Sequence, residues 1–308
     1  MPIVSYLIKR LLQAAFVVVV VSLLVAFAIR MTGDPAMMML GESANVSEAD
    51  LSNIREQMGL NRPFLVQYWD FMSGLFTGNM GESFFRGPIS PLMWQALKAT
   101  SLLAFVSLMI SMLISLPLGV YAARHKNSWA DQAIRILSLT GLSFPNFWLG
   151  IMLMLLFSVT LKWLPVSGFS GMSSLVLPAL TIGIVLTASN LRIIRSAMLE
   201  VLNAQYVMVA RAKGLSENRV IYHHALRNSA ITIITYLGLQ FGALMGGLVV
   251  VELVFSWPGL GTLAIEAISQ RDYPILQTVV TTLAIMIAMV NLFVDVAYVM
   301  LDPRIRLE

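Results

Sequence analysis

The chain has 308 residues, of which 58% are hydrophobic and only 12% charged, and its mean hydropathy is +0.80. These values lie outside the range of soluble globular proteins and indicate a membrane protein. The absence of cysteine excludes disulfide scaffolds, thiolate metal sites and cysteine nucleophiles. The net charge of +4 does not indicate nucleic-acid binding, because the basic residues lie in segments between hydrophobic runs.

Hydrophobic runs long enough to cross a bilayer recur along the chain. A hydrocarbon core of about 30 Å requires roughly 20 apolar residues of helix. The sequence therefore predicts an all-α integral membrane protein with six transmembrane helices. They are expected at about residues 11–30, 100–122, 136–160, 176–194, 230–254 and 276–300.

The first of these runs allows two interpretations. Basic residues precede it and Ala26-Phe27-Ala28 resembles a cleavage site, as in a secretory signal peptide. Between Leu11 and Ile29, however, only two polar side chains interrupt the run, which is longer than the roughly 7–15 residues of a signal core. We interpret residues 1–30 as a short cytoplasmic stub followed by a retained transmembrane helix.

Residues 31–98 form a connection too long to be without structure. Ser47 is a good N-cap for a helix over 47–60, and residues 62–76 place a proline near a helix start and then repeat apolar side chains. We expect short amphipathic helices on the outer surface. They either lie there as surface helices or form a docking surface for an external partner, and the sequence does not separate the two.

The distribution of charge predicts the orientation in the membrane. With the N-terminus in the cytoplasm, the inner segments hold thirteen of the twenty basic residues and only five acidic ones. Because Lys and Arg concentrate on the cytoplasmic side, this topology is favoured. Both termini are then cytoplasmic, and residues 31–98 are extracytoplasmic.

The connection between the fourth and fifth predicted helices, about residues 196–228, is unusually basic. Within it, apolar residues follow i, i+4, i+7, i+8 spacing on a helix: Leu202, Tyr206, Val209 and Ala210. Gly214 can supply the left-handed residue that ends a helix, and Ser216 can cap the next one. The pattern predicts a helix, a tight turn and a second helix at the inner membrane face. Such a hairpin either binds anionic lipid or serves as a handle by which a cytosolic protein moves the transmembrane helices.

The fifth and sixth predicted helices carry features that indicate packing or a translocation path. Gly238, Gly242 and Gly246 recur every four residues, a spacing that lets helix backbones approach closely. Their face either packs within the subunit, meets a partner subunit or lines a pore. Polar groups lie in or near these apolar runs: Glu252, Asn291 and Asp295. Glu252 lies near the outer end of its helix, where it could be merely interfacial, and Asp295 is expected to pair with Arg192 or Arg195.

Several longer motifs follow one another along nearly the whole chain. In chain order they are TGDPA (32–36), MGLNRPFLVQYWDF (58–71), GNMGESF (78–84), SFPNFWLG (143–150), LKWLPVSG (161–168), ARAKG (210–214), HALRN (224–228), FSWPGLGTLAIEAISQRDYPILQ (255–277) and LDPRIR (301–306). Together they resemble the first permease subunit of ABC importers for dipeptides, oligopeptides, glutathione and nickel. The chain departs from the usual EAA loop of ABC-importer permeases: aligned on Gly214, the triplet falls on residues 208–210 without its glutamate, and the later isoleucine and proline are absent.

The resemblance implies a type I ABC importer transmembrane domain in the bacterial inner membrane, with residues 99–302 as its core and 303–308 as a cytoplasmic tail. It also implies a second permease subunit, two cytosolic ATPases that use ATP and Mg, and an external binding protein that delivers di- or oligopeptides. The sequence has no GxxxxGK[ST] phosphate loop, so we expect no enzymatic site in this chain. Ala210 and Gly214 are expected to allow close approach of an ATPase, and Arg211, Lys213 and Arg227 to make polar contacts or serve as positive-inside anchors. The resemblance places these residues in the ATPase-coupling loop together with Tyr206, His224 and Leu226.

Other cargoes and other functional classes are the alternatives to a peptide-importing permease. A nickel chelate or glutathione remains an alternative cargo, although no set of ligands for a bare metal ion is expected, since all three histidines lie on the cytoplasmic side. An ATP-independent carrier or channel would not need the capped hairpin, and no clear internal repeat is present. A membrane enzyme would need a constellation such as HExxH, which is absent.

Overall fold

The computed structural model describes residues 2–31, 33, 36–37, 48–57 and 60–301, and within these ranges the chain is almost entirely helical. Five helices are long and apolar enough to cross a membrane. They are α1 (Pro2–Met31), α5 (Ile89–Arg124), α8 (Met172–Leu202), the continuous helix over Glu217–Gly247 and α14 (Tyr273–Leu301). The predicted all-helical membrane fold is confirmed.

The third predicted span, 136–160, is not a single helix. The structure has α6 (Trp129–Ser143) followed by α7 (Asn146–Met154) and the π-helical segment η1 (Leu155–Thr160), and the two parts are bent by 96°. The bend has a local cause: Pro145 disfavours helical geometry in the residue before it, and Phe144 is extended. Counted as one broken span, the pair brings the total among the described residues to six.

The fifth predicted span, 230–254, is also wrong in its boundaries. The helix begins with α10 (Glu217–Arg219), continues through the π-helical segment η2 (Val220–Ala225) and ends with α11 (Leu226–Gly247). The short helices α12 (Val249–Val254) and α13 (Leu260–Gln270) follow it. The long helix ends at Gly247, the last residue of α11. The predicted span was too long at this end because the apolar run continues in the sequence beyond Gly247.

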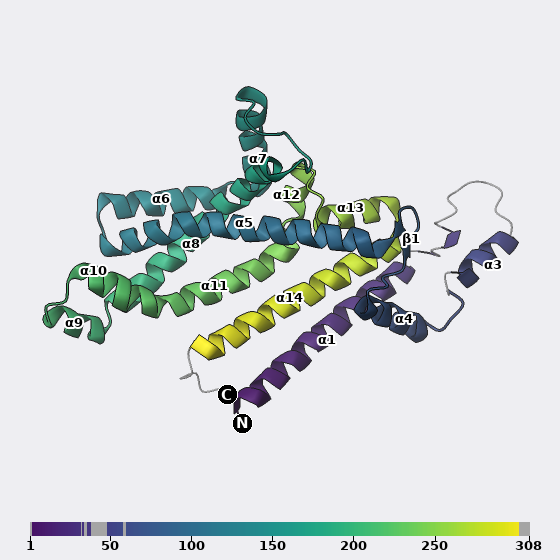
Figure 1. The fold of residues 1–308 in the computed structure, drawn as a ribbon, viewed down its shortest axis with the longest axis horizontal. Helices are drawn as coiled ribbons and strands as arrows, with labels where there is room; N and C mark the ends of the chain where they lie inside the picture. The colour runs from purple at the N-terminus through teal and green to yellow at the C-terminus, as the bar shows by residue number, and fades with distance from the viewer. Residues whose placement is uncertain (1, 32, 34–35, 38–47, 58–59, 302–308) are drawn as a thin grey trace.

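The helices pack around a core formed chiefly by α5 and α8, which lie side by side (Figure 1). One apolar cluster joins these helices to α11, α12 and the loop before α13, where Trp257 is fully buried and donates its indole N–H to the Ala99 carbonyl oxygen at 3.0 Å. By contrast, α1 contacts mainly α14, along one edge of the molecule. The helix α9 (Gln205–Ala212) and α10 lie together at one end of the helix layer (Figure 1).

Between α1 and α5 the structure contains short elements. They are α3 (Glu48–Gln57), α4 (Phe64–Thr77) and a minimal hairpin of β1 (Glu82–Ser83) and β2 (Gly87–Pro88). The two helices expected there are present, although Ser47 lies outside the described residues. The antiparallel strands pair Ser83 with Gly87, and the Ser83 hydroxyl donates to the carboxylate of the buried Asp272 just before α14.

Candidate functional site

The segment over residues 205–225, called here the hairpin, consists of α9, a four-residue turn, α10 and η2. Gly214 adopts φ +79°, the left-handed conformation that glycine tolerates best. The N–H of Leu215 donates to the carbonyl of Ala210 at 3.3 Å, and the N–H of Gly214 donates to Arg211 at 2.9 Å. These two bonds form a Schellman motif, so the predicted glycine stop is confirmed. The side chain of Ser216 occupies the next cap position without making the expected hydrogen bond.

The apolar stripe predicted for the hairpin is buried only in part: Leu202, at the end of α8, and Ala210 are buried. Val207 and Ala210 of α9 pack against Val220 of η2, which joins the two helices into one unit. Tyr206 and Val209 are exposed, contrary to the predicted apolar stripe. The exposed apolar side chains of the hairpin are those of Tyr206, Met208, Val209 and Tyr222. Because α9 is only two turns long and folds back on η2, its buried face depends on the direction of the turn rather than on periodicity.

Polar contacts hold the hairpin to itself and to its neighbours. The Arg211 guanidinium donates to both oxygens of Glu217, at 2.7 and 3.2 Å, across the turn. Hydrogen bonding to this carboxylate raises the pKa of Arg211 above its usual value, so the side chain stays charged. Asn228 donates to the Tyr206 hydroxyl at 2.7 Å, and Arg124 at the end of α5 donates to Asn218 at 3.1 Å. The hairpin is therefore tied to α11 and to α5.

The remaining predicted coupling residues divide into exposed and buried groups. The side chains of Lys213 and Arg227 are exposed, and no ion pair of the described residues involves them. Ala210 is buried inside the hairpin, where it packs with Val207 and Val220. His224 and Leu226 are half-buried, and Leu226 packs on the cluster around Ile221. Within the described ranges, no three His, Cys, Asp or Glu side chains are grouped to hold a metal ion.

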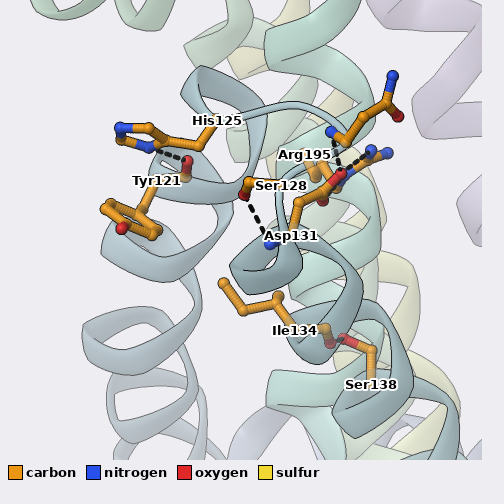
Figure 2. Close-up of polar contacts among 8 residues, drawn as sticks. Tyr121, His125, Ser128, Asp131, Ile134, Ser138 and Arg195 are labelled. Atoms are coloured by element: carbon orange, nitrogen blue, oxygen red, sulfur yellow. Dashed lines mark hydrogen bonds and ion pairs between the residues drawn. The ribbon is translucent and has the colours of Figure 1, made fainter.

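A buried ion pair that the sequence analysis missed joins α6 to α8 (Figure 2). Arg195 of α8 donates to both carboxylate oxygens of Asp131 in α6, at 2.6 and 2.8 Å. Asp131 is fully buried, and it also accepts from the backbone N–H of Asn127 at 3.0 Å. Ser128 in turn caps α6 by accepting from the N–H of Asp131 at 3.2 Å. The spacing of Ser128-Trp129-Ala130-Asp131 is that of a capping box with Asp in place of Glu, which indicates the start of α6 but not the pairing of Asp131 with Arg195.

The predicted pairing of Asp295 with Arg192 or Arg195 is wrong. Arg195 already binds Asp131, and the Asp295 carboxylate lies 3.3 Å from Arg10 of α1. The sequence could not show this pairing because α1 and α14 are at opposite ends of the chain. Asn291, one turn earlier on α14, has an exposed side chain.

The glycines of α11 face α14 of the same chain. A Cβ atom at Gly238 would overlap Val294, and one at Gly242 would lie 3.3 Å from the Asn291 side-chain oxygen. At Gly246 the nearest atom, from Ile287, would be 3.5 Å away, which is ordinary contact. Of the three interpretations of this spacing, packing within the subunit is the one that these contacts match.

Glu252 is fully buried and caps a helix. Its carboxylate accepts from the Thr100 hydroxyl at 2.6 Å and from the backbone N–H groups of Gly261 at 2.8 Å and Thr262 at 3.1 Å. These N–H groups belong to the first turn of α13, which has no partner for them within the helix. Glu252 thus joins α5, α12 and α13 inside the protein, and does not lie exposed at the membrane edge.

Comparison with known proteins places this architecture. Residues 115–307 match the family described as "Binding-protein-dependent transport system inner membrane component", and residues 3–113 match its N-terminal counterpart. The glutathione transport system permease protein GsiC of Salmonella choleraesuis (strain SC-B67) is 39% identical over 304 residues, which cover 98% of this chain and 99% of the relative. A probable peptide ABC transporter permease protein, y4tP of Sinorhizobium fredii (strain NBRC 101917 / NGR234), is 37% identical over 311 residues, with 98% and 99% coverage.

Solved structures show the same fold. An inward-facing MetNI methionine ABC transporter, in its CY5 native crystal form, superposes with a TM-score of 0.57 at 18% identity and covers 69% of this chain and 98% of that one. An amino acid ABC transporter crystallised with histidines gives a TM-score of 0.51 at 16% identity, with 68% and 94% coverage. The matched part is thus nearly the whole of those chains and about two thirds of this one.

Proposed function

The chain belongs to the family of inner membrane components of binding-protein-dependent transport systems, and from this premise we propose that it imports small peptides, glutathione included, into a bacterial cell. It is a multi-pass permease subunit of an ABC importer. The choice of cargo is supported by the relatives, which are named as glutathione and peptide permeases and match nearly the full chain. Glutathione is itself a tripeptide, so one cargo class covers both names.

The hairpin is the part of this chain that would receive the motor's force, and its geometry carries the proposal. It follows α8 in the chain, and its second half is the first part of the continuous helix over Glu217–Gly247, so a displacement of the hairpin acts on two long helices at once. The Schellman turn and the Arg211–Glu217 pair brace the hairpin internally. Its exposed side chains include Tyr206, Met208, Arg211 and Tyr222, and aromatic residues, methionine and arginine are enriched in surfaces that bind another protein.

The proposed assembly contains a second, related permease, two cytosolic ATPases that hydrolyse ATP with Mg, and an external binding protein. The chain itself contributes no phosphate loop, so the energy has to come from those partners. The excess of basic residues on the segments around the hairpin supports a cytoplasmic position for the hairpin and for both termini.

The proposal is tested by uptake of a labelled dipeptide and of labelled glutathione into proteoliposomes that hold the assembled complex and its binding protein. Uptake of either cargo that requires ATP is expected, with a nickel chelate as a competitor that does not reduce it. Uptake independent of ATP would contradict the ATPase-driven mechanism, and ATP-dependent uptake of the chelate alone would contradict the cargo class.

The role of the hairpin is tested with Gly214→Val in the same proteoliposomes. A β-branched residue at φ +79° strains the turn, so uptake is expected to be lost while membrane insertion and assembly persist. Gly247→Ala is the matched control, because nothing lies within 4 Å of its added methyl group. Normal uptake by the Gly214→Val complex would refute the coupling role.

A further inference from the structure

The helix α4 (Phe64–Thr77) has three distinct faces. One face, with half-buried side chains, packs against the protein and includes Phe64, Gln67, Tyr68 and Phe71. A second is exposed and mostly polar, with Asp70, Ser73 and Thr77 around one exposed valine, Val66.

The third face of α4 is apolar and has no cover within the described protein. Leu65, Trp69 and Phe76 are 71%, 72% and 75% exposed. At 100° per residue these three positions fall within about 40° of one another around the helix, so they form a single stripe. We call Leu65, Trp69 and Phe76 the α4 stripe. Three large apolar side chains on one line, each mostly exposed, mark an interaction surface.

The contacts of α4 with α1 give its depth in the membrane. In α1, Arg10 and Arg30 enclose nineteen residues without a charge, which make about 28 Å of helix and match the hydrocarbon thickness. Arg30 therefore marks one edge of the hydrocarbon. The guanidinium of Arg30 lies 4.7 Å from the Phe64 ring centroid and donates to Gln67, while the Tyr68 hydroxyl is 2.7 Å from that of Ser22.

These contacts extend from the edge of the hydrocarbon, at Arg30, inward to the level of Ser22. Ser22 precedes Arg30 by eight residues, or about 12 Å along the helix. Helices that lie in the membrane interface bury their apolar face about 5–10 Å deep. The Arg30 contacts with Phe64 and Gln67 therefore place the first turn of α4 at the edge of the hydrocarbon, and the Tyr68 side chain reaches inward from there to Ser22.

We propose that α4 is a membrane-interface helix whose stripe of Leu65, Trp69 and Phe76 inserts into the lipid leaflet beside the Arg30 end of α1. The same end of α1 also carries exposed apolar side chains, with Leu24 and Phe27 62% and 56% exposed. Tryptophan favours this depth, because its ring is apolar and its N–H reaches water. The polar face with Asp70 and Ser73 then points to the aqueous side. This assignment does not depend on the cargo or on the direction of transport.

The absence of native cysteine makes a direct test possible, because a single introduced cysteine can carry a nitroxide spin label. The labelled positions are Leu65→Cys, Trp69→Cys and Phe76→Cys on the stripe, with Ser73→Cys and Thr77→Cys as matched controls on the polar face. Each variant is measured in the assembled complex in bilayers, by collision with oxygen, which partitions into lipid, and with a water-soluble nickel chelate.

The expected result is high oxygen and low chelate accessibility at all three stripe positions, and the reverse at Ser73→Cys and Thr77→Cys. Stripe labels shielded from both reagents would show that another subunit covers the stripe and would overturn the proposal. Stripe labels open to the chelate, and protected only when the binding protein is added, would identify a protein docking surface and overturn it equally. Retained uptake by the labelled complexes confirms that the substitutions left the assembly folded.

Discussion

Removing the Asp131 carboxylate is expected to destabilise the protein strongly. Its three accepted hydrogen bonds, two from Arg195 and one from the Asn127 N–H, lie in a site where Asp131 is fully buried. Asp131→Ala leaves the Arg195 guanidinium, only 18% exposed, without its carboxylate partner. Breaking a buried pair from one side costs about 3–5 kcal/mol. Asp131→Asn keeps one carbonyl acceptor, so its loss is expected at the lower end of that range.

The measurement is the free energy of unfolding from a denaturant titration of the complex in nanodiscs, followed by tryptophan fluorescence. Arg62→Gln is the control, since its pair with Asp70 is exposed on both sides and contributes about 0–1 kcal/mol. The double variant Asp131→Leu/Arg195→Met is expected to be more stable than either single variant, because no unpaired charge remains. Additive losses in the double variant would refute the view that Asp131 and Arg195 act as a pair.

Further predictions concern three other contacts and use the same titration. Glu252→Gln leaves one carbonyl acceptor for the Thr100 hydroxyl and the two N–H groups at the start of α13, so we expect a loss of about 1–3 kcal/mol; an unchanged midpoint would show that the carboxylate does not hold α13. Gly238→Ala places a methyl group against α14 and is expected to lower the free energy of unfolding by about 1–3 kcal/mol. Gly247→Ala is expected to change it by no more than about 0.5 kcal/mol, and equal effects of the two variants would contradict close packing of α11 on α14. Arg211→Gln loses an exposed pair with Glu217, so stability falls by less than about 1 kcal/mol, and a larger fall would contradict the weak contribution expected of an exposed pair.

Sequence reasoning succeeded where a feature depends on a few neighbouring residues, and it failed where an apolar run hid a local break or where burial depends on packing. The stop at Gly214 was predictable because a left-handed turn is a property of a few neighbouring residues. The break before Pro145 is equally local, but an apolar run masked it. The exposed Tyr206 and the buried Val207 could not be assigned, because the burial of a two-turn helix depends on the element that it folds against.

The sequence by itself determined that this is a helical membrane protein with about six spans, and it identified the family through motifs in a fixed order. These properties depend on hydrophobic length and on short local patterns, which do not require knowledge of contacts. Only the tertiary structure decided which charges meet. Asp131 binds Arg195 across 64 positions, Asp295 lies beside Arg10, and Glu252 reaches Thr100, because helix packing brings together residues that the chain keeps far apart.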